Sequence, residues 1–233
     1  MALYTIGDLH LSLDADKSME VFPGWENYVE RIREGFRGVD REDTVVLCGD
    51  SSWGMSLEGA LKDFRFINDL PGKKLLLKGN HDYWWGTAGK MKKFFADNGL
   101  DTLDILHNNC FFYGDTALCG TRGWWYEDEF GDCHDEKVFR REMLRLRSSL
   151  ESAGDREKIC FLHYPPRYKN YVVPEIMELF AEFGVKQCFY GHLHGPSHRL
   201  AQQGEADGVQ YRLISADYIG FKPWKISIGE EKD

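Results

Sequence analysis

Short apolar runs alternate with segments of helical periodicity along most of the chain. The apolar runs predict strands over residues 3–6, 44–48, 73–78, 158–162 and 187–190. Between them, apolar side chains recur at helical spacing, as at Trp25, Tyr28, Val29, Ile32 and Phe36. A chain in which strands and helices alternate in this way is expected to form an α/β fold.

Further helices are predicted over residues 56–70, 88–98, 135–152 and 174–183. Ser56 is expected to cap the first of these, and Gly99 follows the end of the second. Gly114-Asp115 separates two short apolar runs and predicts a hairpin. Residues 209–215 and 224–228 are predicted to close the fold as strands, forming an antiparallel tail.

Five of the predicted strands end abruptly in polar residues. Where they end, the sequence reads Gly7-Asp8-Leu9-His10, Gly49-Asp50, Gly79-Asn80-His81-Asp82, His163 and Gly191-His192-Leu193-His194. In open α/β sheets, ligands bind beyond the carboxyl ends of the strands, and glycine there lets the backbone turn sharply. The i, i+2 spacing of the Asp8/His10 and His192/His194 pairs would put both side chains of an extended segment on one side.

The side chains at these strand ends favour a metal centre. They offer carboxylate, carboxamide and imidazole groups but no thiolate, which suits Mn, Fe, Zn, Co or Ni better than calcium or a structural zinc. Seven candidate ligands are too many for one catalytic ion, but they fit two ions that share a carboxylate roughly 3.5–4 Å apart. A water between such ions would ionise near neutral pH and attack a phosphorus atom in line. The remaining histidines, His107, His134 and His198, are interpreted as surface or structural residues.

The order of these motifs, from Asp8 to His194, resembles that of the calcineurin-like metallophosphoesterases. The resemblance implies a four-layer αββα sandwich with a di-metal site at one edge. It implies that the first metal is held by Asp8, His10, Asp50 and His194. The second would be held by Asn80, His163 and His192, with Asp50 bridging the two ions. His81 would face the phosphate and stabilise or protonate the leaving oxygen.

Two departures from the family pattern bear on the reaction. The protein phosphatases of this superfamily carry GDxVDRG and GNHE, where this chain has GDSSW and GNHD. Trp53 therefore stands where those enzymes have the aspartate that orients the catalytic histidine, unless Asp82 or a distant residue replaces it. Without such a carboxylate, His81 would be a weaker general acid, which favours diesters or pyrophosphates. The lipid-precursor pyrophosphohydrolases usually carry arginine in place of His81 and match less well.

Arginines and aromatic residues near the predicted site are open to two interpretations. Arg122 and Arg167 either grip phosphate oxygens or form ordinary surface ion pairs. The basic outer face of the 135–152 helix is either a solvated face or an anion-binding surface. Aromatic residues after the second and third predicted strands and after the predicted hairpin either stack on a flat substrate group or pack the layers: Trp53, Tyr83, Trp84, Trp85, Trp124, Trp125 and Tyr126.

Composition narrows the class of protein. The 233 residues, 42% of them hydrophobic, suit a single domain over residues 1–233. The net charge of −9 argues against a long nucleic acid as partner. None of the six cysteines forms a CxxC pair, so reduced thiols are expected. We find no signal peptide and no transmembrane segment, and expect no membrane association and a cytoplasmic location.

These observations predict a metal-dependent phosphohydrolase acting on a small phosphoester, most simply a phosphodiester or nucleotide. Within the site, His81, Asp50, Asp82, Arg122 and Arg167 are the predicted catalytic residues. The alternatives are a phosphomonoesterase, a nuclease of short single strands, or a metal-binding scaffold without catalysis. The metal identities, the natural substrate and the oligomeric state do not follow from the sequence.

Overall fold

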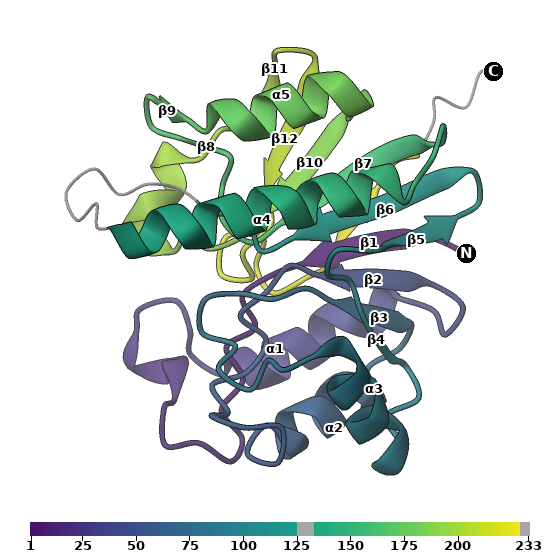
Figure 1. The fold of residues 1–233 in the computed structure, drawn as a ribbon. Helices are drawn as coiled ribbons and strands as arrows, with labels where there is room; N and C mark the ends of the chain where they lie inside the picture. Colours follow the sequence, from purple (N-terminus) through teal and green to yellow (C-terminus); the bar gives the residue numbers. More distant parts are fainter. Residues whose placement is uncertain (125–132, 229–233) are drawn as a thin grey trace.

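Two β-sheets lie face to face between two groups of helices in the computed structural model, which describes residues 1–124 and 133–228 (Figure 1). The first sheet has the strand order β13-β1-β2-β3-β4. Its strands are β1 (Leu3–Ile6), β2 (Thr44–Leu47), β3 (Lys73–Leu76), β4 (Leu103–Ile105) and β13 (Trp224–Ile226). Neighbouring strands from β1 to β4 run parallel, so their carboxyl ends share one edge.

The second sheet has the order β11-β12-β10-β7-β6-β5. Its strands are β5 (Cys110–Tyr113), β6 (Thr116–Thr121), β7 (Glu157–Leu162), β10 (Gln187–Tyr190), β11 (Gly204–Ala206) and β12 (Val209–Leu213). The central strands β6, β7, β10 and β12 are parallel. A separate two-stranded ribbon joins β8 (Arg167–Tyr168) to β9 (Tyr171–Val172).

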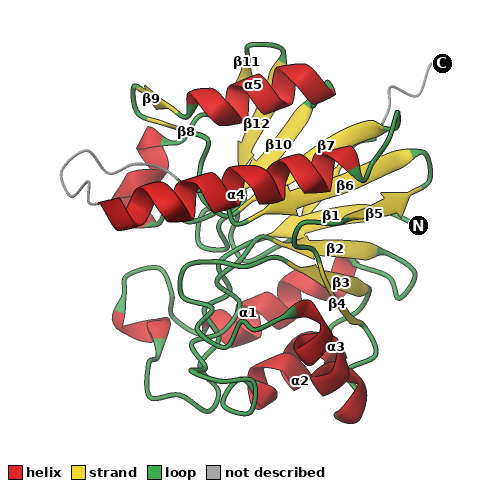
Figure 2. Cartoon of the chain, in the orientation of Figure 1, coloured by secondary structure: helices red, strands yellow, loops and turns green. Residues whose placement is uncertain are grey.

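Helices cover the outer face of each sheet (Figure 2). The first sheet is covered by α1 (Tyr28–Gly35), α2 (Leu61–Asp69) and α3 (Ala88–Asp97). The second is covered by α4 (Cys133–Glu151) and α5 (Pro174–Phe183). Short 3-10 turns lie at η1 (Met19–Val21), η2 (Phe36–Gly38) and η3 (Gly195–Leu200). Among the described residues, no helix is both long and apolar enough to span a membrane.

Three apolar layers hold the four structural layers together, and the central strands supply side chains to two layers each. On β2, Val45 and Leu47 pack against the helices, whereas Val46 packs against the other sheet. On β7, Phe161 faces the space between the sheets and Leu162 faces α4 and α5. Burial on both faces explains why these strands are continuous apolar runs. The predicted αββα sandwich is thus observed.

Local details differ from the sequence prediction in two places. The α2 helix begins at Leu61, later than predicted, although Ser56 caps the turn that leads into it, where Ser56 Oγ accepts a hydrogen bond from Gly59 N (3.1 Å) and Ser56 O accepts one from Ala60 N (3.0 Å). The predicted antiparallel tail is wrong for β12, which pairs in parallel with β10. In this last part of the chain, antiparallel pairing joins β13 to β1 and the short β11 to β12. The described cysteines form no disulfide.

Candidate metal centre

The carboxyl ends of β1, β2, β3, β7 and β10 meet at one edge of the sandwich, where the two sheets adjoin. Backbone hydrogen bonds fix this edge, since Gly7 N donates to Ile214 O (2.9 Å) and Gly191 N donates to His163 O (3.1 Å). Asp8 N donates to Gly49 O (2.9 Å), which joins the ends of β1 and β2. The predicted ligands from five separate strands therefore come together.

Four of the predicted ligands have a left-handed backbone conformation. Their φ angles are 59° at Asp8, 45° at His10, 49° at Asp50 and 74° at His192. Non-glycine residues adopt this conformation rarely, and such strain gathers at functional sites. The segments that carry the Asp8/His10 and His192/His194 pairs are therefore not extended, as their spacing had suggested. Sharp turns, rather than strand alternation, aim these side chains.

Two glycines let the backbone approach the buried carboxylates closely. A Cβ atom on Gly79 would collide with the carboxylate of Asp50, and one on Gly191 would collide with that of Asp8. The glycines at these strand ends are thus needed for space beside the carboxylates as well as for turning.

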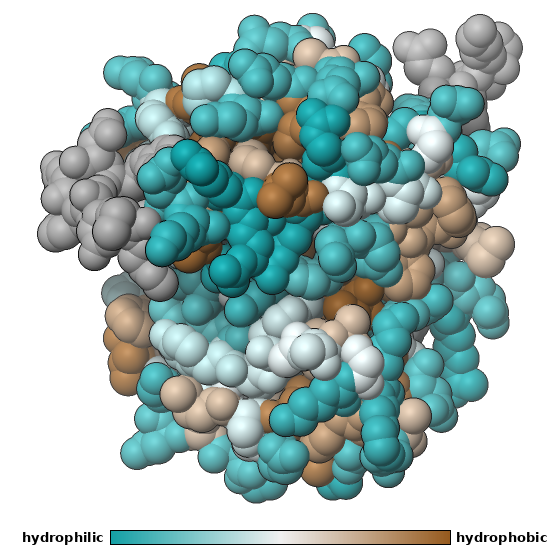
Figure 3. Space-filling view, viewed as in Figure 1, coloured by the Kyte–Doolittle hydropathy of each residue, from teal (hydrophilic) through white to brown (hydrophobic). Residues whose placement is uncertain are grey.

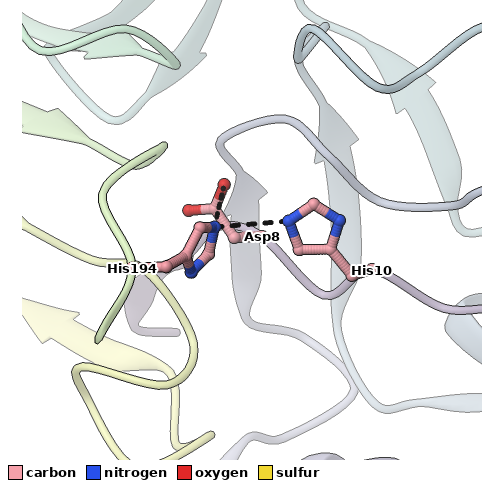
Figure 4. Close-up of side chains that lie close together, drawn as sticks. All are labelled: Asp8, His10 and His194. Carbon is pink, nitrogen blue, oxygen red and sulfur yellow. Dashed lines mark hydrogen bonds and ion pairs between the residues drawn. The ribbon is translucent and has the colours of Figure 1, made fainter. Parts of the chain in front are cut away.

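Three members of the first predicted ligand set, Asp8, His10 and His194, point toward one another (Figure 4). His10 Nε2 lies 3.3 Å from His194 Nε2, and His194 Nε2 lies 3.6 Å from Asp8 Oδ1. His10 Nε2 is also 3.7 Å from Asp50 Oδ2. Ligand atoms about 2.0–2.2 Å from one zinc-like ion lie about 2.8–3.6 Å from each other. The spacings of 3.3 Å and 3.6 Å lie within that range, and the spacing of 3.7 Å to Asp50 lies just outside it.

The second predicted set has the same compactness. Asn80 Oδ1 lies 2.6 Å from His163 Nε2 and 2.9 Å from His192 Nδ1, and these two nitrogens are 3.2 Å apart. His163 Nε2 is 3.5 Å from Asp50 Oδ2. Asp50 therefore faces both sets, as the bridging role requires.

Two of the imidazole rings form a hydrogen bond through Nδ1, the nitrogen that faces away from the other predicted ligands. These bonds fix the tautomer of each ring. His163 Nδ1 lies 3.0 Å from Cys48 O, so it donates there and leaves the Nε2 lone pair for the site. His194 Nδ1 lies 3.0 Å from Asp217 Oδ1, which orients this ring in the same way. Sequence reasoning missed Asp217. It follows the apolar strand β12, which is the same signal that identified the ligands of the other strands.

Buried charge also favours cations at this edge. Asp8, Asp50 and Asp82 are buried, and none forms an ion pair with a lysine or arginine in the described part of the chain. Burial, followed by the charges of Asp82 and Asp8, raises the pKa of Asp50 well above its usual value. Burial also lowers the pKa of His163 and of His192 to about 3, so both rings are neutral donors. Neutral imidazoles and unpaired carboxylates are the groups that divalent ions bind.

Asp82 holds the loops together and is not a partner of His81. Its carboxylate accepts hydrogen bonds from the backbone N–H groups of Asp50 (2.9 Å), Ser51 (2.9 Å), Ser52 (3.4 Å) and Gly79 (2.7 Å), and from Trp84 Nε1 (3.0 Å). These bonds tie the end of β2 to the end of β3. The suggestion that Asp82 replaces the missing carboxylate behind His81 is therefore not supported.

His81 has aromatic neighbours instead of an acidic one. Its ring centroid lies 4.4 Å from that of Trp53, and its Nδ1 lies 3.4 Å from the Tyr83 hydroxyl. The Trp53 ring also stacks on His10, with centroids 5.1 Å apart. Among the described residues, His81 forms no ion pair with a carboxylate. Trp53, which stands in place of the expected aspartate, thus packs against the rings of both His81 and His10.

The remaining predicted residues are the two arginines, which both pair with carboxylates, and the aromatic residues, which differ in exposure. Arg122 follows β6 and pairs with the buried Glu142, and its backbone O accepts hydrogen bonds from the N–H groups that begin the His163 loop. Arg167 pairs with Asp207 and lies over the Tyr211 ring, and neither partner belongs to the predicted ligand sets. Trp84 is buried, as the packing interpretation expects, whereas Tyr83 is 51% exposed. Trp125 and Tyr126 lie outside the described residues.

Comparisons with known proteins identify the family and the fold. The family model for calcineurin-like phosphoesterases matches residues 1–196. The solved structure of TT1561 of Thermus thermophilus is similar, with a TM-score of 0.57, 13% identity and 97% of both chains covered. A protein of unknown function from Aquifex aeolicus, AQ665, has a TM-score of 0.53 and 16% identity, covering 96% of this chain and 95% of its own. These identities show a shared fold only, and no curated protein matched the chain. The chain belongs to the calcineurin-like phosphoesterase family.

Proposed function

We propose that this metal-dependent phosphoesterase uses two ions to hydrolyse a small phosphodiester or nucleotide whose leaving group is stable as an anion. Family membership and the two compact ligand sets support metal-dependent phosphoester hydrolysis in general. The surroundings of His81 carry the finer proposal, because its ring contacts Trp53 and Tyr83 rather than a carboxylate.

The protein's own groups would divide the work as follows. Asp8, His10 and His194 would hold one ion, Asn80, His163 and His192 the other, and Asp50 would contact both. When bound, a pair of such ions supplies a nucleophilic water and neutralises charge on the phosphoryl oxygens. His81 N donates to Asp50 Oδ1 (2.7 Å), which fixes the His81 loop against the bridging carboxylate. The imidazole of His81 would then donate a hydrogen bond to the leaving oxygen.

A histidine without a carboxylate partner is a weaker proton donor. The partner normally fixes the tautomer and stabilises the protonated ring that delivers the proton. Leaving groups that depart as anions depend little on such a donor, whereas poor leaving groups of simple monoesters depend on it strongly. The contacts of His81 therefore favour diesters and nucleotides over ordinary monoesters.

Paired hydrolysis measurements test this proposal. The protein is stripped with a chelator, refilled with Mn²⁺, and assayed with bis-p-nitrophenyl phosphate, p-nitrophenyl phosphate and glycerol 2-phosphate, with Asp50→Asn as the inactive control. We expect the diester to be cleaved fastest and glycerol 2-phosphate, whose alkoxide leaving group needs a proton, to be cleaved slowest. Preference for p-nitrophenyl phosphate over the diester would contradict the proposed substrate class, and efficient cleavage of glycerol 2-phosphate would refute the weak-acid interpretation. Failure to cleave any of the esters with both ions bound would support a non-catalytic scaffold.

A further inference from the structure

A group of basic side chains lies beside the metal centre, on the side covered by α4. Lys78 follows β3, Arg122 follows β6, and Arg145 projects from α4. We call these three residues, together with Glu142, whose carboxylate pairs with both arginines, the basic cluster. Hydrophilic side chains gather over α4 on this side of the molecule (Figure 3).

The basic cluster has more positive than negative charge in a poorly solvated place. Glu142 is completely buried and lies 3.1 Å from Arg122 Nη2 and 2.6 Å from Arg145 Nη1. The side chains of Arg122 and Arg145 are only 14% and 30% exposed. Lys78 is half-buried and forms no ion pair with the described residues. The single Glu142 carboxylate thus pairs with two guanidinium groups.

Buried N–H groups around the cluster have no hydrogen-bond partner in the described part of the protein. They are Arg122 Nε and the indole Nε1 of Trp124. The Arg122 guanidinium lies 4.5 Å from the Trp124 ring centroid, so these donors are neighbours. Burying a donor without a partner is unfavourable, which is why such groups in native proteins usually have one. Arg122 shares its carboxylate partner with Arg145, and its Nε–H group has no acceptor in the described part of the protein. An oxyanion would supply both the negative charge and the acceptor.

The cluster is directly connected to the metal centre. Lys78 immediately precedes Gly79-Asn80, and Arg122 O accepts hydrogen bonds from His163 N (3.1 Å) and Tyr164 N (2.9 Å). The Trp124 ring, next to Arg122, lies 5.1 Å from the Tyr164 ring, which lies 4.4 Å from that of His192. The cluster is therefore separated from the predicted ligand His192 only by the rings of Trp124 and Tyr164, which places it close to a substrate whose scissile phosphorus lies at the ions.

We propose that the basic cluster binds a second anionic group of the substrate, a phosphate in the simplest case. Guanidinium groups suit this task because their planar fork matches phosphate oxygens. This inference rests on the proposed function, and it narrows the substrate class to phosphoesters with two anionic groups. Arg122 and Arg145 would share their N–H groups between Glu142 and the anion, while Lys78 would contribute charge.

Binding of two matched pairs of nucleotides to the metal-loaded protein tests the proposal without requiring turnover. Calorimetry compares ADP with AMP, and thymidine 3′,5′-bisphosphate with thymidine 5′-monophosphate. We expect the extra phosphate to tighten binding about tenfold or more in at least one pair, as charge-assisted hydrogen bonds do. Arg145→Gln and Lys78→Gln should remove that advantage. Lys78→Gln is the safer variant for folding, because it leaves both partners of Glu142 in place.

Arg147→Gln is the matched control, since Arg147 lies on the same helix but pairs with Glu182 through two contacts of 2.6 Å. It should keep the full advantage of the extra phosphate. No advantage in either pair, or an equal advantage in all variants, would overturn the proposal. Free sulfate that binds the cluster without competing with these nucleotides would also overturn it, because the site would then serve a free anion. Absence of hydrolysis with the advantage intact would count against the proposed function alone.

Discussion

Replacing Asp217 with asparagine should weaken one of the two metal positions. Asp217 Oδ1 lies 3.0 Å from His194 Nδ1, and its Oδ2 lies 3.1 Å from both Gly195 N and His198 Nε2. These contacts fix the His194 ring so that Nε2 faces Asp8 and His10. Asparagine keeps the size of the side chain but removes its charge, and its amide NH₂ group cannot accept a hydrogen bond from His194.

The size of the effect follows from the contact that is lost. Outer partners of metal-ligating histidines typically change metal affinity by 10- to 100-fold, or about 1.4–2.7 kcal/mol. A hydrogen bond to a charged group contributes about 1.5–3 kcal/mol, which is the same range. The ligand set of Asn80, His163 and His192 has no contact with Asp217. We therefore expect one ion to bind 10- to 100-fold more weakly while the other is little affected.

Competition with a fluorescent chelator on the Mn²⁺- or Zn²⁺-loaded protein measures the two affinities separately. Asp217→Glu should restore part of the loss, and His198→Gln, which leaves the bond from His194 to Asp217 in place, should change affinity much less. Unchanged affinity in Asp217→Asn would refute the positioning role. Equal weakening of both ions, with a lower melting temperature, would show that Asp217 merely supports the fold.

Three further predictions concern the pH dependence of stability, the space beside the Asp50 carboxylate and the acid strength of His81. Burial lowers the pKa of His107 to about 4, below the value near 6.5 of an unfolded chain. The unfolded state therefore binds more protons between these values, so stability should fall by about 2–3 kcal/mol as pH drops from 6.5 towards 4. Urea unfolding should show a smaller loss in His107→Gln; an identical pH profile would contradict the assignment. Gly79→Ala should abolish binding of the second ion, because its Cβ meets the Asp50 carboxylate. Gly89→Ala, where nothing lies within 4 Å, should leave metal content intact and stabilise α3 by about 0.5–1 kcal/mol. Finally, Trp53→Asp should raise turnover of glycerol 2-phosphate, a monoester with a poor leaving group, relative to that of p-nitrophenyl phosphate, provided that metal content is unchanged; an unaltered ratio would show that Trp53 does not limit His81.

The alternation of apolar runs and helical segments determined the layered α/β fold before any contact was known. It did so because strands buried on both faces must be continuously apolar, as Val45, Val46 and Leu47 are. The same reasoning predicted that the candidate ligands lie close together, since parallel strands end at a common edge and polar residues there are expected to bind a ligand. Local sequence also predicted α5 and β10 with their observed bounds.

Tertiary structure alone decided the features that depend on contacts between distant segments. The direction of β12 follows from its pairing with β10, and a strand's own residues do not encode its partner. The role of Asp82 was decided by four backbone N–H groups that converge on it, and backbone donors leave no trace in residue identity. Arg122 was recognisable as a cation, but only the fold placed it against the buried Glu142 of a later helix. Residue types determine which chemistry is available, whereas long-range packing determines which groups are free to use it.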